Sequence, residues 1–467
     1  MEQSLDNKAI RGTILRLIVP VALENMLQIL ASMINMAMVG RLLVTDISAQ
    51  GLSNRIYGIC FVLFRGLGIG ATLHIAFYYG KGALSSCRRV TEQTYLTVLP
   101  ISLLLALSCT IFSRQFIGLL TDNPVLLETA SRYLRIAIWS IPFMTVLTIN
   151  TAAFNGQNDT KTPMYIAILL NILNVGVSYA AIFGISSVEG FGITGAAIAT
   201  ITSQFFGAAL GLCLLYKKNG ILRAANHEKP FFTLELPDVK SVYSTGIPAA
   251  FEHVLWHVSA LLVTKVILNY GSDVYAAYQL GLQAELVVER LAMGFTVAAA
   301  TLTAQAIAKR DDNLFRAYYK NLVRLSLIMG LCSTLFMLIT SKLFMSFLTD
   351  KPVLREIGTV YLIFMAFTQV QQVLFKTYNG IIRATGSKRV PMYIVFTGIW
   401  LVRVPLIMLV GWYFMWNIVW IWLVISLDQT TEVLLSFAYV KHKKLADFVE
   451  RMHSNKQETK LASFRST

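Results

Sequence analysis

Twelve stretches of this 467-residue chain are each apolar over a length that would cross a lipid bilayer as a helix, which takes about 20 residues. Inside a bilayer the backbone has no water to bond, so a crossing segment satisfies its N–H and C=O groups within its own helix. We therefore expect an all-α integral membrane protein. The predicted spans are residues 14–41, 54–79, 94–112, 130–154, 163–184, 193–216, 242–268, 276–306, 322–340, 358–382, 392–413 and 417–440.

The basic residues are unevenly distributed between the two sides that these spans define. The net charge is +15, and 27 of the 40 Lys and Arg residues lie in segments on the side of the two termini, against eight on the other side. Cytoplasmic segments of membrane proteins are enriched in Lys and Arg. We therefore expect a multi-pass protein of the cell inner (plasma) membrane with both termini cytoplasmic. The lipid bilayer is then its expected partner, and the charge requires no nucleic acid.

The two halves of the sequence repeat each other. Pro20-Val-Ala-Leu-Glu24 in the first span returns as Pro248-Ala-Ala-Phe-Glu252 in the seventh, at an offset of 228 residues. Pro163-Met-Tyr-Ile166 returns as Pro391-Met-Tyr-Ile394 at the same offset. With six spans each, the halves have the same orientation, as in transporters that bind substrate between two repeats. The expected organisation is an N-terminal six-helix bundle (1–216), a cytoplasmic linker (217–240), a C-terminal six-helix bundle (241–440) and a basic cytoplasmic tail (441–467).

Several kinds of chemistry have no support in the sequence. The five cysteines are widely scattered without a CxxC pair, so neither a disulfide framework nor a metal-binding cluster is encoded. The Gly-x-x-x-x-Gly-Lys-Ser/Thr phosphate loop is also absent, which excludes ATP as the source of energy. A membrane-embedded enzyme would need a mid-span set of reactive groups, and only Glu252, His253 and His257 lie close enough in sequence to suggest one. We therefore expect no enzyme and no cofactor.

An ordered set of local motifs resembles a known transporter family. In the first half these are Pro20-x-x-x-Glu24 and Asn35-Met-Ala-Met-Val-Gly40; in the second they are Gly246-Ile-Pro-Ala-Ala-Phe-Glu252, Arg403-Val-Pro405 and Asp428. Together with the twelve spans they make the chain similar, from Leu15 to about Val440, to the multidrug and toxic compound extrusion (MATE) family. That family belongs to the multidrug/oligosaccharidyl-lipid/polysaccharide exporter superfamily.

The resemblance implies two pseudo-symmetric six-helix bundles in a V shape. It implies a monomeric secondary active antiporter that exports amphiphilic organic cations in exchange for protons or sodium by alternating access. The alternative is a flippase of the same superfamily for lipids or lipid-linked saccharides, whose cavity would carry basic residues for a pyrophosphate group. Five basic residues in the interiors of the spans keep that alternative open, namely Arg65, Lys265, Arg290, Lys376 and Arg403.

Three positions depart from what the family often contains. Where members carry an Asp in the first helix, in the fifth helix and in the tenth, this chain has Asn35, Ser178 and Gln372. The resemblance therefore moves the expected coupling role from those positions to the glutamates.

Four glutamates within the spans are the candidate ion-coupling residues. A carboxylate inside a bilayer span is costly, so it is paired, protonated or functional. Glu252 follows Pro248 by one turn and Glu24 is its repeat mate, while Glu285 and Glu289 lie one turn apart on one helix face. Structural ion pairs, with Arg290 as one partner, are the alternative. No metal site is expected, except that a sodium ion near Glu252 stays open.

A further set of polar and aromatic side chains is expected to line a substrate cavity. For the polar members, hydrogen bonding between helices is the alternative role. Five tryptophans lie near the outer ends of the last two spans, and most of them are expected to form an interfacial belt. The five are Trp400, Trp412, Trp416, Trp420 and Trp422. The cavity candidates are Gln28, Asn35, Asn171, Asn174, Ser178, Trp256, Gln283, Gln372 and Asp428.

Overall fold

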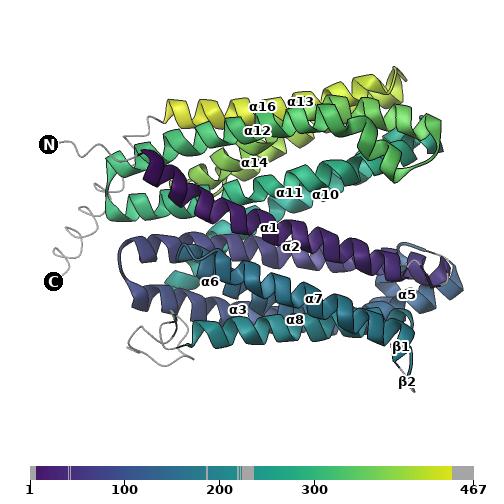
Figure 1. The fold of residues 1–467 in the computed structure, drawn as a ribbon, viewed down its shortest axis with the longest axis horizontal. Helices are drawn as coiled ribbons and strands as arrows, with labels where there is room; N and C mark the ends of the chain where they lie inside the picture. The colour runs from purple at the N-terminus through teal and green to yellow at the C-terminus, as the bar shows by residue number, and fades with distance from the viewer. Residues whose placement is uncertain are drawn as a thin grey trace. The chain divides into compact units, whose positions relative to one another are not determined.

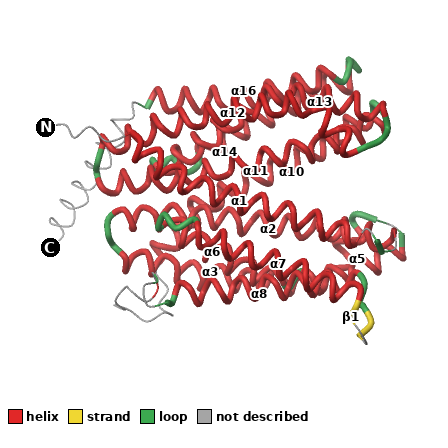
Figure 2. The backbone as a smooth tube through the Cα atoms, in the orientation of Figure 1, coloured by secondary structure: helices red, strands yellow, loops and turns green. Residues whose placement is uncertain are grey.

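The computed structural model describes residues 7–39, 41–42, 44–121, 123–185, 188–217, 220, 222 and 236–443. These residues are almost entirely helical (Figures 1 and 2). Most of the predicted linker and nearly all of the predicted tail lie outside the described residues. The elements are α1 (Asn7–Val39), α2 (Val44–Gly80), α3 (Leu84–Ile111), α4 (Ser113–Gly118), α5 (Pro124–Ala137), α6 (Ser140–Gly156), α7 (Lys161–Phe183), β1 (Gly184–Ile185), β2 (Val188–Glu189), α8 (Ile193–Leu215), α10 (Leu236–Leu268), α11 (Ser272–Lys309), α12 (Asp312–Leu348), α13 (Pro352–Ala384), α14 (Val390–Phe396), η1 (Thr397–Arg403), α15 (Val404–Met408), η2 (Leu409–Tyr413) and α16 (Val419–His442).

The number of membrane spans agrees with the sequence prediction. Among the described residues, eleven helices are long and apolar enough to cross a bilayer, and α5 with α6 forms a twelfth that is bent by 43°. This bent pair is the predicted span 130–154. The helices extend beyond the predicted spans; for example, α12 covers Asp312–Leu348 where 322–340 was predicted. Hydropathy detects only the apolar part, whereas the helix begins at its cap, where the Asp311 side chain accepts a hydrogen bond from the Leu314 N–H.

The chain forms two compact units, and each contains the first residues of a helix that continues in the other. One unit comprises Val19–Val254, and the other comprises Met1–Ile18 with Leu255–Thr467. The division therefore falls within α1, just before Pro20, and within α10, a few residues after Pro248. The prolines are the pair related by the 228-residue repeat.

Two glycines related by the repeat allow close backbone contacts with the amino-terminal parts of α1 and α10. A Cβ on Gly66 of α2 would lie 2.5 Å from the backbone N of Ala250, and a Cβ on Gly246 would lie 2.8 Å from the Cα of Leu67. In the other unit, a Cβ on Gly294 of α11 would lie 2.6 Å from the carbonyl oxygen of Ile18. Gly66 and Gly294 are 228 residues apart, and so are Ile18 and Gly246. The same backbone contact is therefore built twice, once in each unit.

Polar contacts fix the beginnings of the same two helices. Arg89 of α3 forms an ion pair with Asp238 in the first turn of α10, with 2.5 Å between Nε and Oδ2. In the other unit, Arg11 of α1 donates from Nε to Oδ1 of Asn321 on α12, at 3.0 Å. Asn321 in turn donates to the Asn7 side chain, also at 3.0 Å.

The bundle formed by α11 to α16 carries the most strongly buried charged groups. Within it α13 packs against α11, α12 and α16, and α16 packs against η1. Figure 1 shows α12, α13 and α16 running side by side. Its core contains an aromatic cluster in which the rings of Tyr278 and Trp422 are stacked at 5.4 Å and Tyr361 meets both edge-on. The site described next lies beside this cluster.

Candidate functional site: buried carboxylates of the α11–α16 bundle

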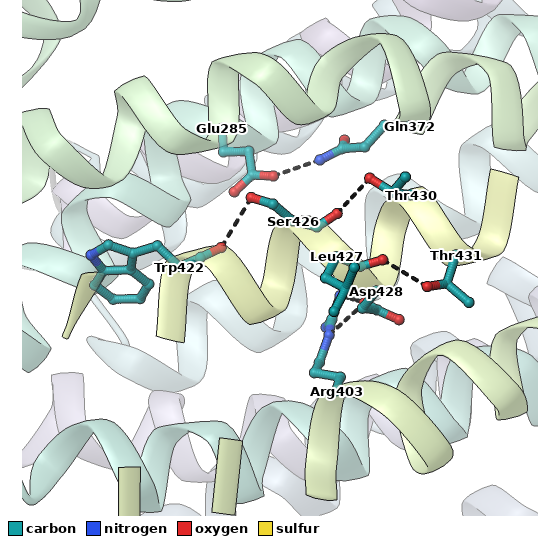
Figure 3. Close-up of polar contacts among 9 residues, drawn as sticks. All are labelled: Glu285, Gln372, Arg403, Trp422, Ser426, Leu427, Asp428, Thr430 and Thr431. Atoms are coloured by element: carbon teal, nitrogen blue, oxygen red, sulfur yellow. Dashed lines mark hydrogen bonds and ion pairs between the residues drawn. The ribbon is translucent and has the colours of Figure 1, made fainter. Parts of the chain in front are cut away.

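Glu285 is a buried carboxylate whose hydrogen-bond partners are neutral. It lies on α11 with an exposed fraction of 9%. The Tyr361 hydroxyl donates to Oε2 at 2.6 Å, and the Gln372 amide donates from Nε2 to Oε1 at 2.7 Å. Both donors come from α13, and Figure 3 shows the contact with Gln372. The two oxygens of Glu285 are thus held from one neighbouring helix, and no cation of the described residues contacts them.

A glycine brings Tyr361 to this carboxylate. Gly281 lies one turn before Glu285 on α11, and a Cβ there would approach Cδ1 of the Tyr361 ring to 2.4 Å. Because glycine leaves this space open, the ring packs closely against α11 and its hydroxyl reaches Glu285 in the next turn. The aromatic cluster with Tyr278 and Trp422 fixes the other faces of the ring.

The second glutamate of α11 has a cationic partner. Lys376 of α13 donates to Oε1 of Glu289 at 2.7 Å. The sequence offered Arg290 as the alternative partner, and the structure shows Lys376 in contact instead. The carboxylate of Glu289 also interacts electrostatically with Glu285. The i, i+4 pair predicted on one helix face is therefore present, and its two members have partners of different charge.

Asp428 of α16 forms an ion pair with Arg403 at the end of a π-helical turn. Arg403 donates from Nε to Oδ2 of Asp428 at 2.7 Å, and its terminal amino group contacts the same oxygen (Figure 3). The Asp428 side chain is completely buried, and its Oδ1 has no hydrogen-bond partner among the residues that the structure describes. Glu432, one turn further along α16, and Tyr278 also interact electrostatically with Arg403.

The π-helical turns explain how Arg403 reaches this position. The span 390–413 contains two of them, η1 and η2, and such turns are rare and frequently found at functional sites. Pro405 follows η1 and has no N–H to continue an α-helical ladder. At the start of η1, Gly398 lets α16 approach closely, because a Cβ there would lie 2.7 Å from Oδ1 of Asp428.

We expect Gly398→Ala to destabilise the protein, because the added methyl group would push Asp428 away from Arg403. Overpacking of this kind costs about 1–3 kcal/mol. The measurement is the Tm of the purified protein in detergent. Gly176→Ala on α7 is the matched control, since a Cβ there meets nothing within 4 Å. Equal Tm values for the two variants would show that the contact at Gly398 is not tight.

The serine and threonine hydroxyl groups in the middle of α16 donate within the helix. Ser426 donates to the carbonyl oxygen of Trp422 at 3.0 Å, and Thr430 donates to that of Ser426 at 2.9 Å. Thr431 donates to the carbonyl oxygen of Leu427 at 2.8 Å (Figure 3). The contacts of α16 with neighbouring elements include the Asp428 carboxylate, which accepts from Arg403, and the Tyr439 hydroxyl, which donates to Ser387 at 2.7 Å.

The other unit brings together uncharged candidates. Asn35 of α1 donates to Oδ1 of Asn174 on α7, which donates from Nδ2 to Ser203 of α8 at 2.9 Å. Ser178 is buried one turn after Asn174. Within the described residues, Oδ1 of Asn35 and Nδ2 of Asn171 are buried without a hydrogen-bond partner. The predicted cavity residues Asn35 and Asn174 are thus joined to each other and to Ser203 by hydrogen bonds between uncharged side chains.

The remaining candidates lie on α1, α10 and α11. Glu24 is partly buried on α1 and interacts electrostatically with Arg65 of α2. Glu252 is partly buried on α10, in the turn after Pro248. Trp256 has an exposed fraction of 42%. Gln28 and Gln283 are also exposed at the surfaces of their helices. Among the described residues no group of three or more His, Cys, Asp or Glu side chains could hold a metal ion.

The sequence-based interpretation missed two residues of the site and misplaced a third. Tyr361 was not singled out, because one tyrosine in an apolar span gives no signal. Gly398 carries no chemistry of its own. Trp422 is one of five tryptophans of which most were expected in an interfacial belt, whereas its side chain is fully buried against Tyr278 and Tyr361. A belt position was inferred because these tryptophans lie near the helix ends. Burial depends instead on whether the side chain lies on the face of the helix that packs against the bundle.

These spans, with charged groups enclosed between them, define a multi-pass membrane protein. The MatE family profile matches residues 20–180 and 248–409, one segment in each half of the chain. The two matched segments begin at Pro20 and Pro248, the repeat-related prolines. The chain belongs to the MatE family.

Named relatives and solved structures agree with this membership. The chain is similar to the probable multidrug resistance protein NorM of Thermotoga maritima, with 26% identity over 442 residues that cover 94% of each chain. It is 24% identical to the probable multidrug resistance protein YoeA of Bacillus subtilis over 430 residues, covering 90% of this chain and 91% of that protein. A multidrug resistance MATE family transporter of the MOP superfamily, solved in an outward-facing conformation, matches with a TM-score of 0.85 at 16% identity, over 96% of this chain and all of that one (100%). The fold is that of a MATE transporter, as the sequence predicted.

Proposed function

We propose that the protein is a secondary active multidrug efflux antiporter. It exports amphiphilic organic cations in exchange for an entering cation, by alternating access across the inner membrane. The observation that carries this proposal is the environment of Glu285, a buried carboxylate whose hydrogen-bond donors are the neutral groups of Tyr361 and Gln372. A buried carboxylate without a cation in contact gains most by binding a proton or another cation.

The partners of the other carboxylates support this choice. Glu289 contacts Lys376, Asp428 contacts Arg403, and Glu24 interacts with Arg65. These three are compensated by basic side chains of the protein itself. Glu285 is therefore the first coupling residue that we propose, with Glu289 beside it, and Glu24 and Glu252 as a second, repeat-related pair.

The uncharged cluster of the other unit supports a role in substrate binding. Asn35, Asn171, Asn174 and Ser178 carry amide and hydroxyl groups that can bind a polar substituent of an organic cation without changing charge. Gln28, Trp256, Gln283, Gln372 and Asp428 complete the proposed cavity residues, and Trp256 offers an aromatic face to a cation. The relatives named as probable multidrug resistance proteins support a role in multidrug efflux.

The flippase alternative is less well supported. Recognition of a pyrophosphate group needs basic side chains that are available to an anion. Lys376 and Arg403 instead contact Glu289 and Asp428, and Lys265 lies over the Trp412 ring at 5.3 Å. Because these basic side chains already interact with groups of the protein, they are less available to an anion, and this favours a cationic substrate.

The proposal includes a monomer with both termini in the cytoplasm, without a cofactor and without enzymatic activity. We expect inside-out vesicles that contain the protein to accumulate ethidium when a proton gradient or a sodium gradient is imposed. The two gradients are applied separately, because uptake under only one of them identifies the coupling ion. Vesicles with no imposed gradient are the control. Absence of uptake under both gradients, with the protein inserted, would refute the antiporter and favour an anionic or lipid-linked substrate.

A further inference from the structure

Two side-chain contacts between α11 and α13 lie one helical turn apart. Gln372 donates to Oε1 of Glu285 at 2.7 Å, and Lys376 donates to Oε1 of Glu289 at 2.7 Å. Residues four apart in sequence are neighbours on one face of a helix, so the two carboxylates of α11 lie next to each other, and so do their partners on α13. In the described part of the chain, Glu285 receives hydrogen bonds from neutral groups, whereas Glu289 receives one from an ammonium group.

The ion pair of Lys376 with Glu289 is more accessible than the pair of Arg403 with Asp428. Its two side chains have exposed fractions of 14% and 28%, against 10% and 0% for the other pair. Arg403 also contacts its carboxylate through two nitrogen atoms, whereas a lysine presents one compact ammonium group on a flexible stem. Charged groups within spans face the bundle interior or a water-filled cavity. Of these two ion pairs, the pair of Lys376 with Glu289 is therefore the one that a ligand can more readily reach and separate.

The ammonium group of Lys376 has the charge and the position that the charged group of a cationic ligand would take. Removing the cation from a carboxylate within a span leaves an uncompensated charge, which is costly. Replacing one cation by another avoids that cost. The displaced ammonium group can turn toward water, because a long alkyl stem lets the charged end of a lysine move while the stem stays packed.

We propose that Glu289 binds the charged group of an amphiphilic organic cation, and that Lys376 is a tethered competitor that determines the affinity for such cations. The inference rests on the proposed function, because it takes the exported cation as the ligand. A neutral compound of similar shape does not compete with an ammonium group for a carboxylate. Lys376 therefore affects the binding of cations alone, which is a property that a purely structural ion pair does not have.

The test compares a cation with a neutral compound of similar shape. Tetraphenylphosphonium is a hydrophobic cation, and triphenylphosphine oxide is a neutral phosphorus compound with the same kind of aryl groups. The Kd of each is measured by calorimetry with the full-length protein in lipid nanodiscs, at fixed pH and salt. Lys376→Met removes the competing ammonium group and should lower the Kd of tetraphenylphosphonium by about fivefold or more, as expected for the loss of a partly exposed ionic competitor. The Kd of the neutral oxide should not change.

Lys376→Arg should have the opposite effect. A guanidinium group can bond both oxygens of a carboxylate, so it should compete more strongly than an ammonium group. We expect the Kd of tetraphenylphosphonium to rise by about fivefold, with no change for the neutral oxide. This variant keeps the ion pair, so it decides the question even where Lys376→Met does not fold.

Two further variants show whether the gain in affinity depends on Glu289. The double variant of Glu289→Gln with Lys376→Met carries neither charge of the pair, and it should bind tetraphenylphosphonium about fivefold or more weakly than Lys376→Met alone. Lys265→Met is the matched control. It removes another ammonium group within a span, one that lies over the Trp412 ring at 5.3 Å, and should leave both Kd values unchanged.

The possible outcomes are distinct. The inference would be overturned by a Kd of tetraphenylphosphonium that does not fall in Lys376→Met, by one that falls in Lys376→Arg as well, or by an equal change for the neutral oxide. Tetraphenylphosphonium that does not bind the wild-type protein would also overturn it. Kd values that move as expected in a protein whose ethidium uptake responds to neither gradient would refute the proposed antiport alone.

Discussion

Glu285→Gln is expected to reduce gradient-driven ethidium uptake to the level of empty vesicles. Glutamine has nearly the volume of glutamate but takes up no proton and carries no charge to bind a cation, so exchange loses its coupling step. The fold should survive. Tyr361 can still donate to the new amide oxygen, and Gln372 can turn its own carbonyl oxygen, which is buried without a partner, toward the new amide nitrogen.

The control for this variant is another carboxylate on the same helix. Asp273→Asn lies in the exposed first turn of α11 and should leave uptake unchanged. The Tm of each variant and its binding of ethidium are measured beside transport, so that loss of coupling is separated from loss of folded protein. Wild-type uptake by Glu285→Gln, with uptake lost in Glu252→Gln, would move the coupling role to the repeat-related pair.

Gly66→Ala and Gly294→Ala are expected to be strongly destabilising, and by similar amounts. Each added methyl group would meet backbone atoms, at 2.5 Å from N of Ala250 or 2.6 Å from the carbonyl oxygen of Ile18. Backbone cannot move aside as the end of a side chain can, so the helix itself must shift, at a cost of about 1–3 kcal/mol or more. The measurements are the Tm and the yield of monodisperse protein in detergent.

Gly58→Ala is the matched control for these variants. It lies on α2 two turns before Gly66, and a Cβ there meets nothing within 4 Å. In a helix interior alanine is favoured over glycine by about 1 kcal/mol, so this variant should be as stable as the wild type or more stable. If the Tm of Gly66→Ala were equal to that of Gly58→Ala, the close contact of Gly66 with α10 would be contradicted.

The fold could be predicted from the sequence because the bilayer imposes a strong and local constraint. Length and hydropathy locate spans, and the fixed 228-residue offset shows the duplication. The contact of Gly66 with Ala250 and its counterpart at Gly294 could not be predicted in this way, since glycines in a span have no distinctive pattern. The offset relates them only once the contact is seen.

The site could be predicted in part. Glu285, Gln372, Asn35 and Asn174 were selected because polar groups within spans are costly, and the structure joins the first two to each other and the last two to each other. Which side chains contact these residues, and whether those side chains are charged, depends on how helices that are far apart in sequence are rotated about their axes relative to each other. That is why Lys376 rather than the neighbouring Arg290 was found against Glu289, and why Tyr361 and the burial of Trp422 were missed.

The division of the chain within α1 has a consequence for its synthesis. Residues 7–18 contact Gly294 and Asn321, which the ribosome adds about 300 residues later. The amino end of the first helix therefore meets these permanent neighbours only after α11 and the start of α12, in the second half, have been translated. By contrast, the start of α10 meets partners on α2 and α3 that were made long before. Biogenesis is thus asymmetric in time, although the finished contacts are symmetric in space.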